Sequence, residues 1–342
     1  MEVPSIYLNR VLSEGAKRRA FSLHLTVGNF PIIKVGGEFF KLENENLVTA
    51  DLLNRIVDFF LSEAEKIRFK QKKEIVLVKE LGNLRFRINV FYQKGIPSFS
   101  FYFIPKTIRT LQELRLPKIL GNLIETNFGL FIIAGHYGSG RTTTASALIE
   151  EINRTESKHI ITLEKPIENL FVSKSSVVEQ REIGKDVNSV LDGLRYCLEE
   201  DVDVVYVSEI KKNFSEAIPL ILEIASGNAL VLLEMNASNT ITAIEKFLST
   251  AQGKMSSEIS RYALADVLVA VLAQRLFHGR GGNAVVAHEL LIANQPVRSL
   301  IREGKIYQLE SIIQTSRREG MISMKRSIED LVSMGEIRAE EI

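Results

Sequence analysis

The chain has 342 residues, enough for two domains with a substantial core, and its hydrophobic and charged fractions of 45% and 25% are those of an ordinary globular protein. Lysine and arginine number 43 against 42 acidic residues, which argues against a polybasic protein built mainly to bind nucleic acid. The single cysteine, Cys197, excludes an intramolecular disulfide, so the composition fits a reducing compartment better than a secreted disulfide scaffold.

The N-terminal twenty residues carry no long apolar run behind a basic start, so we expect no signal peptide. No stretch of the sequence approaches the roughly 20 apolar residues of a membrane span. Any association with a membrane is therefore expected to be peripheral, through a partner.

The first hundred residues alternate helical and strand patterns, which predicts an N-terminal α+β domain over residues 1–105. The expected elements are a helix over 5–19, a strand over 22–28, two short strands over 31–42 about the Gly36-Gly37 turn, a helix over about 49–68, and three strands over 73–105 with turns at Gly82-Asn83 and Gly95.

Residues 106–126 read as a linker and connecting helix, after which the pattern changes to strands alternating with helices. Such alternation indicates a largely parallel sheet with crossover helices, so residues 127–342 are expected to form one α/β domain with a helical C-terminal region. The expected strands are 128–135, 159–164, 202–209, 229–235 and 284–293, and the expected helices are 141–153, 187–199, 213–225 and 239–252.

A glycine-rich stretch between the first strand and helix of this domain carries the main chemical signal. Gly135-x-x-x-x-Gly140-Arg141-Thr142 fits the phosphate-binding pattern G-x-x-x-x-G-K-[ST] except at the lysine. Gly135, Gly138 and Gly140 let backbone amides converge on an anion, and the helix N-terminus adds a favourable partial charge. A glycine-rich turn without a ligand is the alternative, and the spacing and flanking elements favour a phosphate loop.

The hydroxyl residues after the glycines have distinct expected roles. Thr142 can place its hydroxyl on Mg²⁺, and Thr143 can reach an inner phosphate. The candidate nucleotide-binding residues of the loop are Gly135, Gly138, Ser139, Gly140, Arg141, Thr142 and Thr143.

Arg141 stands where the pattern requires lysine. Lysine is a compact point charge, whereas arginine is a planar fork of five donors, so Arg141 keeps the charge but is wider and differently aimed. Anion binding can survive on backbone amides and charge. Hydrolysis is expected to suffer more, because phosphoryl transfer depends on positioning and on stabilising the charge of the transition state.

Two glutamates close expected strands of the parallel sheet, Glu164 and Glu209. The carboxyl ends of strands are where open α/β sheets bind ligands. Each side chain could orient the attacking water or act on Mg²⁺ through a water molecule, and each could instead be a surface acid at a strand end. Both are candidate catalytic residues, and which one activates water stays open.

Several segments together carry a resemblance to a known family. The chain resembles the retraction ATPases of type IV pili, the PilT-like branch of the type II/IV secretion ATPases. The family-like segments are SLHLTVG (22–28), LRFRINVFYQKG (84–95), INRTESKHIITLEKPIENLF (152–171), VVEQREIGKDVNSVLDGLR (177–195), EEDVDVVYVSEIK (199–211), PVRSLIREGK (296–305) and IQTSRREGM (313–321). The last two resemble the segments typical of the retraction branch.

The resemblance implies a PAS-like N-terminal domain and a RecA-like, P-loop ATPase core that binds ATP and Mg²⁺. It also implies that Arg85 and Arg87, which share one face of a strand, meet the nucleotide; a solvated basic face is the alternative. The family assembles as a hexameric ring on the cytoplasmic side of the inner-membrane pilus platform. For this chain the implied partners are a homo-hexamer, or a mixed ring with an intact paralogue, and the platform protein.

The departures from the family pattern concentrate where chemistry is expected. They are Arg141 for the loop lysine, Lys165 for aspartate, Glu199 for arginine, Ser208 for glycine, Lys211 for arginine, Tyr102 for a phosphate-contacting arginine, and Asn228 and Asn236 nearest the places of two histidines. Lys165 is also expected to lower the basicity of Glu164.

Three functions therefore remain open from the sequence. The first is a retraction-type subunit of the twitching motility machinery that binds ATP but hydrolyses it weakly or not at all. The second is a slow, working retraction ATPase, and the third is a structural or adaptor ring that binds no nucleotide.

Overall fold

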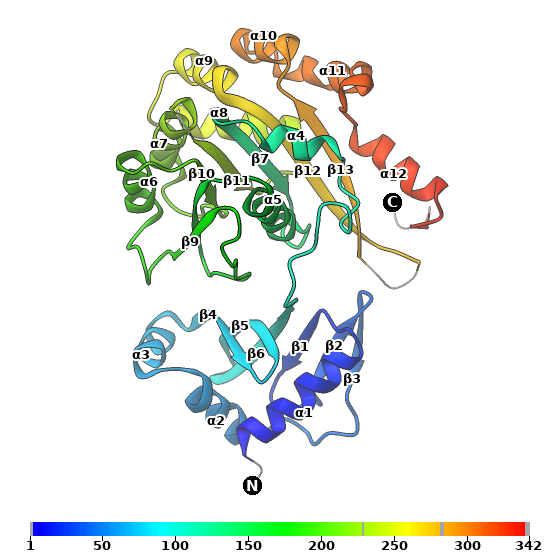
Figure 1. Ribbon diagram of the computed structural model, residues 1–342. Coiled ribbons are helices and arrows are strands. Elements are labelled where there is room, and N and C mark those ends of the chain that lie inside the picture. The colour runs from blue at the N-terminus through cyan, green and yellow to red at the C-terminus, as the bar shows by residue number, and fades with distance from the viewer. Residues whose placement is uncertain (1–2, 228, 281–283, 339–342) are drawn as a thin grey trace. The chain divides into compact units, whose positions relative to one another are not determined.

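The computed structural model describes residues 3–227, 229–280 and 284–338, which fall into two compact units, Met1–Thr107 and Ile108–Ile342 (Figure 1). Within the described ranges every helix is too short or too polar to span a lipid bilayer. The two units are described separately.

The first unit is built on a six-stranded antiparallel sheet with the strand order β3-β2-β1-β6-β5-β4. Its elements are α1 (Pro4–Lys17), β1 (Ser22–Leu25), β2 (Ile32–Val35), β3 (Glu38–Lys41), α2 (Ala50–Phe60), α3 (Glu63–Lys72), β4 (Glu74–Leu81), β5 (Leu84–Gln93) and β6 (Ile96–Ile104). The alternating and turn-bounded patterns that predicted the strands are confirmed. The core of this unit forms where the helices pack on the sheet, for example through Leu8, Leu53 and Phe101.

The single helix expected over 49–68 is wrong, because the chain forms two helices there. Leu61 is extended, at φ −96° and ψ 128°, and ends α2. Ser62 then caps α3 in a capping box, in which its hydroxyl accepts from the Glu65 amide while the Glu65 carboxylate accepts from the Ser62 amide. The Ser62-x-x-Glu65 spacing is a local start signal that outweighs the continuous helical propensity around it.

The second unit contains a seven-stranded sheet with the order β13-β12-β7-β11-β10-β8-β9, in which only β13 runs antiparallel to its neighbour (Figure 1). Its strands are β7 (Gly129–Gly135), β8 (His159–Glu164), β9 (Val177–Glu182), β10 (Val204–Val207), β11 (Leu230–Met235), β12 (Leu268–His278) and β13 (Ala284–Ile292). The expected parallel sheet is confirmed.

Helices cover both faces of this sheet. Helices α4 (Ile119–Ile124) and α5 (Arg141–Thr155) share one hydrophobic cluster with it. The opposite cluster is formed with α6 (Val190–Glu199), α7 (Phe214–Ser226), α8 (Thr240–Ala251), α9 (Ser257–Val267), α10 (Gln295–Glu303) and α11 (Leu309–Thr315). Helix α12 (Met324–Ser333) packs beside β13.

Strands β9 and β12 were not predicted. β12 begins in the continuous apolar run 267–273, whose periodicity does not separate a buried strand from a buried helix. β9 alternates weakly, with half-exposed side chains, because it is the edge strand of the sheet.

Candidate nucleotide site

The phosphate-loop candidate lies between a strand and a helix, as the spacing predicted. All seven residues of β7 are buried, and the strand ends at Gly135. Gly138 and Gly140 adopt φ angles of +80° and +90°, which glycine alone adopts readily. Gly140 is the N-cap of α5 and has no side chain to cover the helix start, so the first amides of α5 can bind an anion.

The interior of the loop fits an anion. A Cβ atom on Gly135 would lie 2.2 Å from Ser139 Oγ and 2.8 Å from the Gln274 carbonyl oxygen, so the backbone turn is closed tightly on itself. Ser139 Oγ and Arg141 Nη1 are buried and find no hydrogen-bond partner among the described residues. Buried donors are normally satisfied, so two open donors in one glycine-rich loop indicate a place for phosphate oxygens.

Arg141 is held by one of the two candidate catalytic acids. Its Nη2 donates to Glu209 Oε2 at 2.6 Å, and the two side chains are 7% and 25% exposed. Glu209 does not close a strand as expected, since β10 ends at Val207 and Glu209 follows in a loop. The arginine fork therefore points one terminal nitrogen at an acid while the other stays open.

Glu234, a second acid near the loop, was not among the site residues predicted from the sequence. It lies in β11 between β7 and β10, is 4% exposed, and accepts a 2.6 Å hydrogen bond from the Tyr206 hydroxyl. Burial raises the pKa of Glu234, while Tyr206, Arg141 and Thr142 act in the opposite direction. An acid inside the apolar run LVLLEM was the available signal, because an ionisable residue in a central strand is rarely there for packing.

Glu164 ends β8 as predicted and is 3% exposed. Its Oε1 accepts hydrogen bonds from Thr162 Oγ1 at 2.7 Å and from Gln180 Nε2 at 3.0 Å. Burial raises the pKa of Glu164 to about 7, and the charges of Glu234 and Glu168 act in the same direction.

The expectation that Lys165 would lower the basicity of Glu164 is therefore wrong. The Lys165 side chain is exposed, so water screens its charge. The buried Glu164 carboxyl instead has a pKa of about 7, which suits a proton acceptor near neutral pH.

The two threonines of the loop differ in their surroundings. Thr142 is half-buried and is a hydrogen-bonding neighbour of Glu234, whereas Thr143 is exposed. The next residue, Thr144, is buried and accepts a 2.8 Å bond from Gln274 Nε2.

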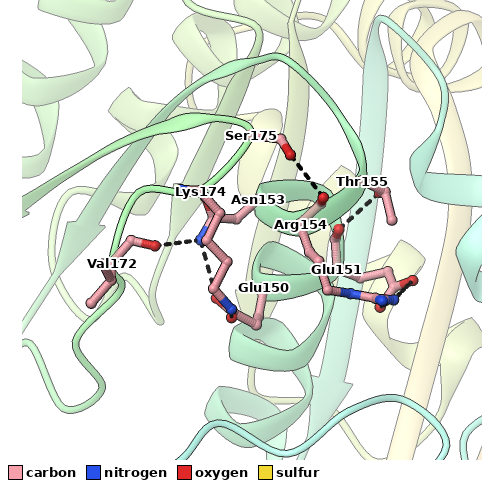
Figure 2. A network of polar contacts seen from close by, with 8 residues as sticks. All are labelled: Glu150, Glu151, Asn153, Arg154, Thr155, Val172, Lys174 and Ser175. Carbon is pink, nitrogen blue, oxygen red and sulfur yellow. Dashed lines mark hydrogen bonds and ion pairs between the residues drawn. The ribbon is translucent and has the colours of Figure 1, made fainter.

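The far end of α5 carries a polar network that fixes the loop after β8 (Figure 2). Asn153 is fully buried, donates to the Val172 carbonyl oxygen at 2.8 Å, and accepts from the Lys174 amide at 3.0 Å. The amides of Ser175 and Ser176 both donate to the Asn153 carbonyl oxygen. The helix that starts at the phosphate loop is thereby bonded to the segment that follows Glu164.

The two arginines expected to reach the nucleotide belong to the first unit. Arg85 pairs with Glu80 at 2.7 Å, and the Arg87 guanidinium lies 4.7 Å from the centroid of the Tyr102 ring. Both lie on the face of β5 opposite the buried Phe86. Their role toward a nucleotide stays a prediction.

Asn228 and Asn236 are nearest to the positions where the family has two histidines, and the structure describes Asn236. Asn236 follows β11 and is half-buried, with its carbonyl oxygen accepting from Lys246 Nζ at 2.8 Å. Asn228 lies outside the described residues.

The segment 296–305 has a clear structural task. Arg298 in α10 donates to the carbonyl oxygens of Ala265, Asp266, Leu268 and Ala293. Its guanidinium therefore joins α10 to the end of α9 and the start of β12.

Comparison with known proteins places this geometry in context. The family model for type II/IV secretion system proteins matches residues 110–281. A twitching motility protein of Neisseria gonorrhoeae is 35% identical over 312 residues, which cover 91% of this chain and 82% of that protein. The type IV pilus retractation ATPase PilT of Pseudomonas aeruginosa is 31% identical over 334 residues, which cover 97% of this chain and 96% of that protein.

A crystal structure of the pilus retraction motor PilT with bound ADP is similar along nearly its full length. Its TM-score is 0.84 at 32% identity, with 97% of this chain and 94% of that chain covered. The expected fold class, an N-terminal sheet domain followed by an ATPase core with C-terminal helices, is thereby confirmed.

Proposed function

The chain belongs to the type II/IV secretion ATPase family, in its PilT-like branch, and from this membership we propose that it is a nucleotide-binding subunit of a type IV pilus retraction motor with weak or absent hydrolysis. The subunit acts in a homo-hexamer or in a mixed ring with an intact paralogue. The ring lies in the cytoplasm against the inner-membrane pilus platform protein.

The observation that carries this proposal is that Arg141 has one terminal nitrogen bonded to Glu209 and one without a partner among the described residues. Its open Nη1 and the open Ser139 Oγ support phosphate binding, since both are buried donors without partners among the described residues. The hydrogen bond from Arg141 Nη2 to Glu209 Oε2, at 2.6 Å, supports the proposal of weak hydrolysis. A carboxylate engaged by a guanidinium is a poorer base, because the adjacent positive charge stabilises its ionised form.

The residues proposed to hold the nucleotide are those of the loop, Gly135, Gly138, Ser139, Gly140, Arg141, Thr142 and Thr143, with Arg85 and Arg87 as further candidates. Mg²⁺ would meet the Thr142 hydroxyl. The described residues hold no group of three or more acidic, histidine or cysteine side chains arranged for a metal. Mg²⁺ is therefore proposed to arrive with the phosphates, as it commonly does.

The hydrolytic residues are proposed to be Glu164, as the water-orienting acid, and Glu209. The raised pKa of Glu164, about 7, favours Glu164 as the proton acceptor. A slow, working ATPase is the second candidate function. The presence of Glu209 beside the loop and of the buried Glu164, with its raised pKa, favours it.

Titration of the purified protein with a fluorescent ATP analogue, followed by a phosphate-release assay, tests the proposal. We expect saturable binding and phosphate release close to background, with and without an intact paralogue. Sustained release by the protein alone would favour the slow ATPase instead. A complete lack of binding would contradict both of these functions and would favour a structural or adaptor ring that binds no nucleotide.

Changing Arg141 to lysine is expected to raise phosphate release by less than about tenfold. The lysine would restore one group among several that act together, and the effects of such groups are not additive. It would also remain beside Glu209 and Glu234. Phosphate release by Arg141→Lys beside wild type is the measurement, and turnover equal to that of an intact pilus ATPase would show that the other departures are harmless.

Changing Glu209 to glutamine is expected to tighten nucleotide binding about tenfold in the absence of Mg²⁺, because it frees Arg141 Nη2 for phosphate. The same change should lower the thermal midpoint, since Arg141 is 7% exposed and loses its charge partner. Titration with the fluorescent ATP analogue measures the affinity, and thermal unfolding of the same preparation measures the midpoint. Unchanged affinity would mean that the ion pair does not compete with the nucleotide.

Ring formation is expected from the family membership and is measured by light scattering over a range of protein concentrations. We expect a mass near six subunits, at least with nucleotide or with an intact paralogue present. A monomer under all these conditions would contradict the proposed assembly.

A further inference from the structure

Gln180, in the edge strand β9, is the meeting point of three hydrogen bonds beside the candidate catalytic acid. Its Nε2 donates to Glu164 Oε1 at 3.0 Å and to the Asn169 carbonyl oxygen at 2.8 Å. Its Oε1 accepts from the Phe171 amide at 2.9 Å. One side-chain amide therefore ties a buried carboxyl to the backbone of the loop that follows it.

The strand register places this amide. Gln180 lies opposite Thr162, and Glu164 is two residues further along β8, so the three side chains share one face of the sheet. Thr162 Oγ1 and Gln180 Nε2 both donate to Oε1 of Glu164. Two donors on one oxygen fix the orientation of the carboxyl group.

The same loop is bonded to the helix that begins at the phosphate loop. Asn169 Nδ2 donates to Ser146 Oγ in α5 at 2.9 Å, and Ser146 is buried. Hydrogen bonds thus run from α5 through Asn169 and Gln180 to Glu164, independently of the Asn153 network in Figure 2.

We propose that Gln180 is a positioning residue of the nucleotide site, whose amide fixes the Glu164 carboxyl relative to the loop at 169–171 and, through Asn169, relative to α5. That the site binds nucleotide rests on the proposed function. That Gln180 orients the Glu164 carboxyl does not. A donor to a carboxylate stabilises its ionised form, so loss of Gln180 raises the pKa of Glu164 further. Thr162 remains as a donor, and Glu168 and Glu234 continue to oppose ionisation.

Thermal unfolding of the full chain at pH 5 and pH 8 tests the contact with Glu164. Gln180→Met keeps the length of the side chain and removes its hydrogen bonds. Relative to wild type, we expect its midpoint to fall by about 3–6 °C more at pH 8 than at pH 5, because the lost bond is to the ionised carboxylate. In a Glu164→Gln background this extra loss at pH 8 should disappear.

Two controls keep the result specific. Gln252→Met makes the same chemical change at an exposed site and should show no dependence on pH. Gln180→Glu keeps an acceptor for the Phe171 amide but sets a carboxylate against Glu164, so it should be the least stable variant at pH 8. A loss in Gln180→Met that is equal at both pH values, or equal in both backgrounds, would reduce Gln180 to a loop anchor and overturn the proposal.

Hydrogen exchange at the Phe171 amide tests the link to α5. In wild type, a saturating ADP analogue should slow this exchange at least about threefold, and Ser146→Ala should remove the effect. An undiminished effect in Ser146→Ala would overturn the link. The unfolding experiment needs no nucleotide, so failure of nucleotide binding contradicts the proposed function without deciding how Gln180 acts on Glu164.

Discussion

Nucleotide binding is expected to fall by at least about 100-fold when Gly135 is changed to alanine. The added Cβ would lie 2.2 Å from Ser139 Oγ and 2.8 Å from the Gln274 carbonyl oxygen. Ser139 can rotate away, but the carbonyl belongs to β12, which is paired with β7 and β13 on its two sides, and can move only with the sheet. The loop is therefore expected to open, which separates the amides that would converge on phosphate.

The Gly135→Ala protein is also expected to be less stable by about 1–3 kcal/mol, the usual consequence of overpacking. Analogue titration and urea unfolding measure the two effects. Gly121→Ala is the matched control, because Gly121 lies within α4 and a Cβ there would have no atom within 4 Å. The control should bind as wild type does, and normal binding by Gly135→Ala would mean that nucleotide does not use this loop.

Changing Glu164 to glutamine is expected to stabilise the protein increasingly as the pH rises. Burial raises the pKa of this carboxyl from 4.5 to about 7. Below pH 4.5 the group is protonated in both the folded and unfolded states and contributes no difference. Between pH 4.5 and 7 the unfolded chain releases the proton first, so the wild type loses stability, and above pH 7 the whole penalty is present.

The expected gain of Glu164→Gln, measured as the free energy of unfolding at pH 8 relative to pH 5, is about 2.5 kcal/mol. Each pKa unit corresponds to 1.36 kcal/mol, so the whole penalty is about 3.4 kcal/mol, of which about 0.8 kcal/mol is already present at pH 5. Glutamine can still accept from Thr162 and Gln180 through its amide oxygen. Glu223→Gln, which changes an exposed acid in α7, is the control and should show little such gain. A flat profile for Glu164→Gln would mean that the carboxyl is ionised freely in the folded protein.

The parts of the fold that the sequence predicted depend on local pattern. The loop from Gly135 to Thr142 was recognisable because its glycines, its hydroxyl residues and its flanking apolar strand lie within one short stretch. The break between α2 and α3 was predictable in principle, since Ser62 and Glu65 form a capping box from neighbouring residues.

The parts that escaped prediction depend on contacts between distant residues. Arg141 and Glu209 are 68 positions apart, and their ion pair exists only because the sheet brings two loops to one edge. The pKa of Glu164 could not be read from its neighbour Lys165, because burial and not sequence proximity sets it. Glu234 was visible as a charge in an apolar run, but its contact with Tyr206 needs the order of β10 and β11 in the sheet.

The hydrogen bonds of Asn153 are expected to protect the loop after β8 from proteolysis, although part of that loop is exposed. Lys174 is exposed and would ordinarily mark a site for trypsin. A protease must draw several residues around the cleaved Lys174–Ser175 bond into an extended strand, yet the backbone amides of both residues donate to Asn153. Cleavage there would first require the segment to peel away from the last turn of α5. This stretch of surface therefore shares the rigidity of the helix beneath it.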